Sequence, residues 1–177
     1  MAELLRQYFR IAFLMGRPQD LPGGSVQLWI GVALAGVTYL VALAGIHGLG
    51  RSIAHVVLDL GCTALAFRVA LALVGHPGRF EQAFGGLCGA SAWVNAAAVP
   101  IYLSRSLGAQ ISAADALAEF VLLVWSLSLL AHVLRHTFGL GLGVSIAVAF
   151  AWVVVLVSVM GTVLPPPLSV DGPTAML

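Results

Sequence analysis

Four ionisable side chains lie within apolar stretches of this chain, at a spacing that puts them in pairs. His55 precedes Asp59 by four residues, and Asp115 precedes Glu119 by the same interval. Residues four apart share one face of a helix. Carboxylates and imidazoles are the groups that relay protons or hold cations inside a membrane. We therefore predict one intramembrane polar cluster of His55, Asp59, Asp115 and Glu119, at similar depth on neighbouring helices.

A structural interpretation of the same residues stays open, and the general behaviour of polar groups in membrane helices favours it. Arg51 and Arg105 lie at the same boundary and can neutralise the acids. Polar side chains in membrane helices also hold helices together. The spacings match no metal signature and no catalytic constellation. We therefore expect no metal, no catalytic residue and no cofactor; a haem would require His76 with His132 or His136.

A second polar group is expected at the opposite, cytoplasmic boundary. Arg68 follows Asp59 by nine residues, which places it on nearly the opposite helix face, where its long side chain can extend to the surface. His132 and His136 share a face beside Arg135. Cations near a helix C-terminus cap the helix dipole, and they also suit lipid headgroups or a partner protein. Arg68, His132, Arg135 and His136 are the candidates for such contacts.

The elements that position these residues are five long apolar stretches. Each has the roughly 20 residues that a helix needs to cross a bilayer. Continuous rather than alternating hydrophobicity predicts helices, not a barrel. The predicted spans are 26–46, 52–75, 82–104, 111–138 and 142–164, and Pro165 ends the last of them. The fold class is therefore all-α, a bundle of five transmembrane helices with short links.

The first 16 residues predict a separate amphipathic helix. Apolar and aromatic residues at spacings of three and four, including Tyr8 and Phe9, oppose Arg6 and Arg10. Such a helix lies in the headgroup region or packs on the bundle, and both alternatives stay open. The domain organisation is then an interfacial helix over 1–16, a five-helix domain over 17–164, and a Pro-rich tail over 165–177.

Composition and charge placement indicate the compartment. Hydrophobic residues make up 60% of the 177, charged residues only 8%, and the net charge of +1 gives a nucleic-acid partner no support. The basic residues are all Arg, which suggests a GC-rich, bacterial genome. Most Arg residues fall on one side of the predicted topology. The N-terminus is therefore expected in the cytoplasm and the C-terminus outside, in the bacterial inner membrane.

Small residues mark the third predicted span as a packing surface. Gly85 and Gly89 have the spacing that lets two helix backbones approach closely, and alanines extend the same surface. We expect this helix at the centre of the bundle or at an oligomer contact.

The passage His76-Pro-Gly-Arg-Phe-Glu-Gln-Ala-Phe-Gly-Gly, before a Gly/Ala-rich span with Pro100, resembles the Yip1-like membrane proteins. The N-terminal amphipathic segment and five close spans extend the resemblance over nearly the whole chain. It implies a five-span fold and a membrane-organising or partner-binding role, with no catalytic residue. No long polar region like that of the eukaryotic members precedes the first span in this sequence, so we do not expect their trafficking partners.

Three functions follow from these features. The first is a non-enzymatic membrane protein that binds lipid, another membrane protein or itself. The second is a small proton or cation transporter that uses the acidic cluster between the second and fourth spans. The third, an intramembrane enzyme, has only the hydroxyls of Ser91 and Ser126 to offer. Ion flux and its dependence on Asp59 and Glu119 discriminate the second from the first.

Overall fold

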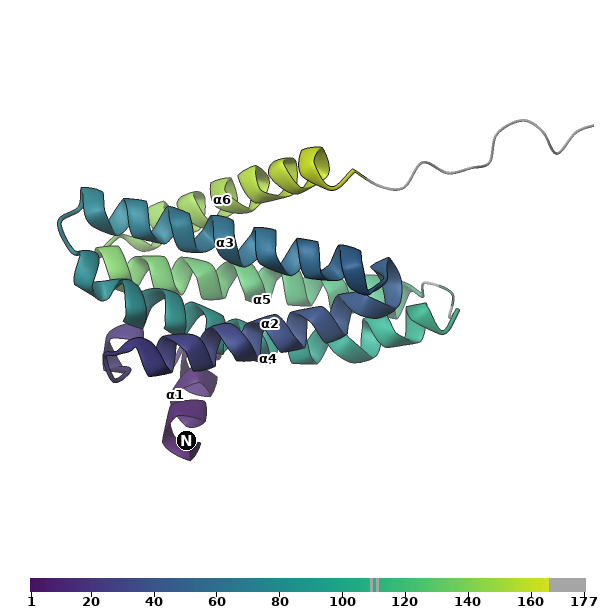
Figure 1. The fold of residues 1–177 in the computed structure, drawn as a ribbon, viewed down its shortest axis with the longest axis horizontal. Helices are drawn as coiled ribbons and strands as arrows, with labels where there is room; N and C mark the ends of the chain where they lie inside the picture. Colours follow the sequence, from purple (N-terminus) through teal and green to yellow (C-terminus); the bar gives the residue numbers. More distant parts are fainter. Residues whose placement is uncertain (109, 111, 166–177) are drawn as a thin grey trace, which may run out of the picture.

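The computed structural model describes residues 1–108, 110 and 112–165, and this part of the chain is helical without strands. Five helices are long and apolar enough to cross a membrane. The predicted all-α class is confirmed. The elements are α1 (Ala2–Ala12), η1 (Pro18–Asp20), α2 (Ser25–His47), α3 (Leu49–Leu73), η2 (Pro77–Arg79), α4 (Phe80–Ser106), α5 (Ala113–Phe138) and α6 (Leu142–Val163) (Figure 1).

The helix ends lie within a few residues of the predicted spans, because local breakers set them. Gly48, with φ of 74°, separates α2 from α3. Gly139 takes the left-handed conformation after α5, and its N–H donates to the Arg135 carbonyl. Both positions favour glycine, which has no Cβ to clash. Most of the predicted tail over 165–177, and Ile111 at the predicted start of the fourth span, lie outside the described residues.

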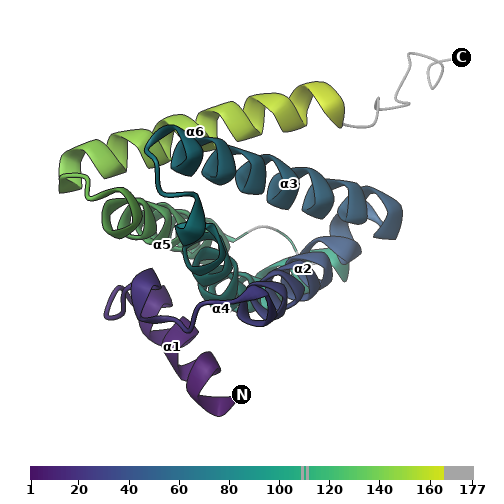
Figure 2. The ribbon, with the colours of Figure 1, turned by 60° about the vertical axis from the view of Figure 1, so that its left-hand side comes forward.

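The helices form layers. Helix α1 lies on one side of the bundle, α2, α4 and α5 lie in the middle, and α3 and α6 cover the other side (Figures 1 and 2). Helices α2, α4 and α6 begin at the end of the bundle where α3 and α5 finish. That end is called the near end below, and the other is called the far end.

Helix α4 is the centre of the bundle, and it packs most closely on α2. A Cβ added at Gly31 of α2 would lie 2.5 Å from the Gly85 carbonyl oxygen of α4. Toward the far end, a Cβ at Gly45 would lie 2.6 Å from the Ser106 side chain. The two backbones touch along their length because glycines remove the side chains between them. The small residues of α4 around Gly85 thus pack against α2 of the same chain.

Helix α1 docks across α4. Tyr8 is fully buried, and its ring covers Gly89, where a Cβ would lie 2.4 Å from the ring carbons. The Tyr8 hydroxyl donates to the Gln27 carbonyl at 2.6 Å. On the α5 side, the Trp125 indole N–H donates to the Ala12 carbonyl at 2.7 Å. One face of α1 therefore packs on the bundle, as one of the two alternatives from the sequence predicts. The charged face of α1 is exposed.

The buried phenol makes α1 docking sensitive to alkaline pH. Burial, followed by the nearby Cys88 thiol, raises the pKa of Tyr8 to about 12 from its ordinary value of 10.0. The docked state thus prefers the neutral phenol, so docking is fully stabilised below pH 10 and weakens as the pH rises from 10 through 12. We expect amide hydrogen exchange in α1 to accelerate over this range beyond the intrinsic rate. A Tyr8→Phe variant with the same extra acceleration would contradict the assignment.

Candidate functional site

A cavity of about 260 Å³ lies between the α3–α6 layer and the middle layer, and all five long helices line it. Most of the lining is apolar, including Phe84, Leu87, Leu130 and Trp152. The polar part of the lining consists of Tyr39, Asp59, Thr63, Cys88, Ser91, Asn95 and Ser126. A mostly apolar cavity with a few converging polar groups is the usual form of a small-molecule site.

Asp59 supplies the charge of this cavity. The Thr63 hydroxyl, one turn further along α3, donates to Asp59 Oδ1 at 3.4 Å. The Tyr39 hydroxyl approaches the same carboxylate from α2. Among the described residues, the Arg side chains form ion pairs only with Glu3 and Glu119. The polar neighbours of the Asp59 carboxylate are therefore neutral hydroxyls. In the described part of the chain, no cationic side chain forms an ion pair with it.

The cavity lies in the central third of the helices. Asp59 follows the first residue of α3 by ten positions, about 15 Å along an axis of roughly 37 Å at 1.5 Å per residue. Tyr39, Ser91, Asn95 and Ser126 lie at comparable positions in their own helices. If the five helices cross a bilayer, these polar groups are at the depth where water cannot solvate them.

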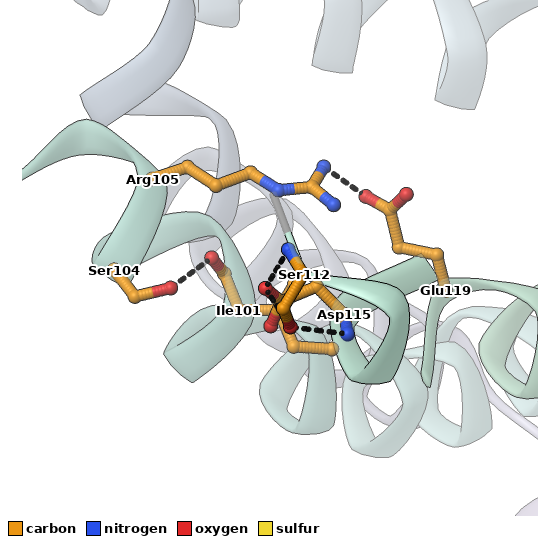
Figure 3. Close-up of polar contacts among 6 residues, drawn as sticks. All are labelled: Ile101, Ser104, Arg105, Ser112, Asp115 and Glu119. Atoms are coloured by element: carbon orange, nitrogen blue, oxygen red, sulfur yellow. Dashed lines mark hydrogen bonds and ion pairs between the residues drawn. The ribbon is translucent and has the colours of Figure 1, made fainter. Parts of the chain in front are cut away.

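The structure does not bring the four predicted cluster residues together. Asp115 caps α5: its carboxylate accepts from the Ser112 N–H at 2.9 Å, and its own N–H donates to the Ser112 hydroxyl at 3.2 Å. Glu119 forms an ion pair with Arg105 at the far end of α4 (Figure 3). Both acids are used in local contacts near the start of α5.

His55 is one turn from Asp59 on α3 but does not line the cavity. Its ring stacks on His47 of α2, with centroids 5.4 Å apart. The His55 Nε2 atom is buried and has no hydrogen-bond partner in the described part of the chain. Arg51, one turn further out, donates to the carbonyls of Leu164 and Pro165 at 2.6 Å each. Of the predicted cluster, Asp59 alone faces the cavity.

The residues predicted at the cytoplasmic boundary lie at the near end, where several of them hold the N-terminal segment. The His132 Nε2–H donates to the Gly16 carbonyl at 2.7 Å. The His136 ring contacts the His132 ring edge-on, and its carbonyl accepts from Gln19. Arg135 is exposed, and the exposed Arg68 guanidinium lies 5.5 Å from the Phe80 ring centroid. Arg68 and Arg135 therefore stay open to headgroups or a partner, whereas His132 is used within the chain.

A second cavity adjoins the first on the near-end side. It measures about 110 Å³ and is lined by apolar residues of α3, α5 and α6. Leu130 and Trp152 line both cavities. The pair of cavities thus has a polar part around Asp59 and an apolar part beyond Trp152.

Sequence reasoning missed Tyr39 and Thr63 as neighbours of Asp59. Thr63 carried a signal, since it follows Asp59 by four residues and shares its helix face. Tyr39 carried none, because its place beside Asp59 depends on how α2 packs on α3. Ser91 and Ser126, noted only as available hydroxyls, both line the cavity.

Comparison of this chain with protein-family models, with curated proteins and with solved structures found no match.

Proposed function

We propose that this chain is a non-enzymatic integral membrane protein that takes a small amphiphile from the bilayer into the cavity around Asp59. The observation that carries the proposal is the cavity itself, in which one carboxylate and several hydroxyls lie among apolar and aromatic side chains. Polar groups inside hydrocarbon are unfavourable unless they are hydrogen-bonded. A ligand with both polar and apolar parts satisfies this lining.

Binding fits the surroundings of Asp59 better than conduction does. Toward the near end, the space beyond the cavity is bounded by buried apolar side chains such as Phe67, Leu71 and Leu134. A pore would require polar groups or water along this path. The cavity therefore resembles a pocket that ends in apolar side chains more than a segment of a channel.

The proposal includes no catalytic step. Ser91 and Ser126 offer hydroxyls to the cavity, but Ser126 donates to the Leu123 carbonyl of its own helix at 2.9 Å. The imidazoles of His47 and His55 stack on each other outside the lining. Covalent catalysis uses a nucleophile within hydrogen-bond reach of a base. The two serines line the cavity, whereas the two imidazoles lie outside its lining.

A matched pair of serine substitutions tests the proposal. The probe is 4-phenyl-1-butanol, a neutral amphiphile, and its binding to the protein in nanodiscs is measured by saturation-transfer NMR. Ser91→Leu fills the cavity and is expected to weaken binding at least tenfold, and Ser126→Leu should act in the same direction from α5. Ser158→Leu makes the same change on the exposed face of α6 and should leave binding unchanged.

Two results would overturn the proposal. The first is a wild-type protein that binds no more probe than empty nanodiscs. The second is an equal effect of Ser91→Leu and Ser158→Leu, since the probe would then bind the lipid-facing surface or the bilayer.

A transport function is the second candidate, and the position of His55 favours it. His55 lies one turn closer to the far end than Asp59 on α3, and His47 is the last residue of α2 at that end. Imidazoles are proton carriers near neutral pH. Proton flux into proteoliposomes that is lost in Asp59→Asn would support this candidate. Flux that is absent, or equal in the variant, would exclude it.

The remaining assignments are proposals that rest on the sequence. They are a Yip1-like relationship, a bacterial inner-membrane location with the N-terminus in the cytoplasm, and a protein partner or second copy in the membrane. The exposed Arg68 and Arg135 are the residues that we propose for headgroup or partner contact. Gly85 and Gly89 are covered by α1 and α2 of the same chain. We therefore propose that a protein partner or second copy contacts a different surface of the bundle.

A further inference from the structure

We infer that the ligand of the cavity is a lipophilic organic cation, with an ammonium group against Asp59 and an apolar chain in the adjoining apolar cavity. The inference rests on the proposed function and names the chemical class that the site would take. Charge, lining and shape support it separately.

Asp59 places a carboxylate in the wall of the cavity. A carboxylate at the centre of a membrane helix bundle is costly unless a cation or a proton neutralises it. The two arginines nearest in sequence are used elsewhere: Arg51 donates to the carbonyls of Leu164 and Pro165, and Arg68 lies beside Phe80. Arg105 of α4 pairs with Glu119. The described residues thus leave Asp59 without an internal cation, and a bound ammonium would provide one.

The lining also suits an ammonium. This group has three N–H donors and no acceptor. Besides the Asp59 carboxylate, the cavity offers the side-chain oxygens of Ser91 and Asn95 as acceptors. The rings of Tyr39, Phe84 and Trp152 also line it, and aromatic faces attract cations. An anionic headgroup would meet Asp59 with a like charge, which disfavours the common anionic lipids.

The shape argues for an organic cation over a metal ion. A cavity of about 260 Å³ holds the liquid volume of about nine waters, far more than a bare ion fills. The described residues also contain no group of three or more His, Cys, Asp or Glu that could hold a metal. The adjoining cavity of about 110 Å³ extends the space past Leu130 and Trp152 with apolar walls. A ligand with a cationic head and an apolar chain matches this arrangement, with the head in the larger, partly polar cavity and the chain in the adjoining apolar one.

The test compares two probes that differ only in the head. They are 4-phenylbutylammonium and 4-phenyl-1-butanol, measured on the full chain in nanodiscs of zwitterionic lipid. The wild type should bind the ammonium at least tenfold more tightly than the alcohol. Asp59→Asn should remove this preference while changing the affinity for the alcohol less than threefold, which also reports an intact cavity. Asp59→Glu should keep the preference.

Asp115→Asn is the matched control, because it makes the same change outside the cavity, at the third residue of α5, where the Asn oxygen can still accept from the Ser112 N–H. It should keep the full preference. Alcohol binding without a preference for the ammonium, or a preference that persists in Asp59→Asn, overturns the inference and leaves the proposed function standing. Binding of neither probe overturns both.

Discussion

Gly31→Ala should destabilise the bundle by about 2–3 kcal/mol, the upper range for adding a methyl group where no space exists. The new Cβ would lie 2.5 Å from the Gly85 carbonyl oxygen and 3.2 Å from the Gly89 nitrogen. Both atoms belong to the α4 backbone, so no rotamer change can relieve the overlap. Helices α2 and α4 must therefore separate along their closest contact. The midpoint of thermal or SDS-induced unfolding in detergent measures the loss.

Gly61→Ala is the matched control for this substitution. Gly61 lies in the middle of α3, and no atom lies within 4 Å of a Cβ built there. Alanine has the higher helix propensity, by roughly 0.5–1 kcal/mol, so this variant should be as stable as the wild type or more so. A Gly31→Ala variant as stable as Gly61→Ala would contradict the close packing of α2 on α4.

Gly89→Ala should release α1 from the bundle while the five long helices remain assembled. The added Cβ would lie 2.4 Å from two carbons of the Tyr8 ring. The ring is held in place, because its hydroxyl donates to the Gln27 carbonyl and the residue is fully buried. We expect a cost of about 2–3 kcal/mol, which falls on α1 docking. Amide hydrogen exchange in α1 should accelerate at least tenfold.

The pattern of exchange distinguishes release of α1 from general loosening. The amides of α3 and α6, which lie on the other side of the bundle, should keep their protection in Gly89→Ala (Figure 2). Unchanged exchange in α1 would contradict the docked position of Tyr8. Equal acceleration in every helix would contradict the view that α1 is a separately docked element.

The sequence predicted the long helices well because their signals are local. Length and continuous hydrophobicity marked each span, and glycines such as Gly48 and Gly139 marked their ends. The small residues of α4 also predicted close packing. Their partners, α1 and α2, could not be predicted, because the spacing of glycines does not say which helix approaches them.

The site was predicted only in part, for a physical reason. Spacing along one helix correctly groups residues on a face, but it carries no information on which faces meet. Asp115 and Glu119 share their spacing with His55 and Asp59, yet a capping interaction and an ion pair with Arg105 hold them at the far end (Figure 3). Asp115 had a local signal, since Ser112 and Asp115 have the spacing of a capping box. Apart from Leu60 and Thr63 of the same helix, the residues that line the cavity with Asp59 come from four other helices, and their positions depend on tertiary packing.

Locating a bound probe decides whether the cavity around Asp59 is a binding site. A diazirine analogue of 4-phenyl-1-butanol is photolysed with the protein in nanodiscs, and the labelled residues are identified by mass spectrometry. We expect labelling that excess 4-phenyl-1-butanol suppresses, centred on Asp59 and Thr63 of α3 and on Ser91 and Asn95 of α4. Labelling confined to exposed lipid-facing residues such as Val57 and Val157, with no competition by the alcohol, would contradict it.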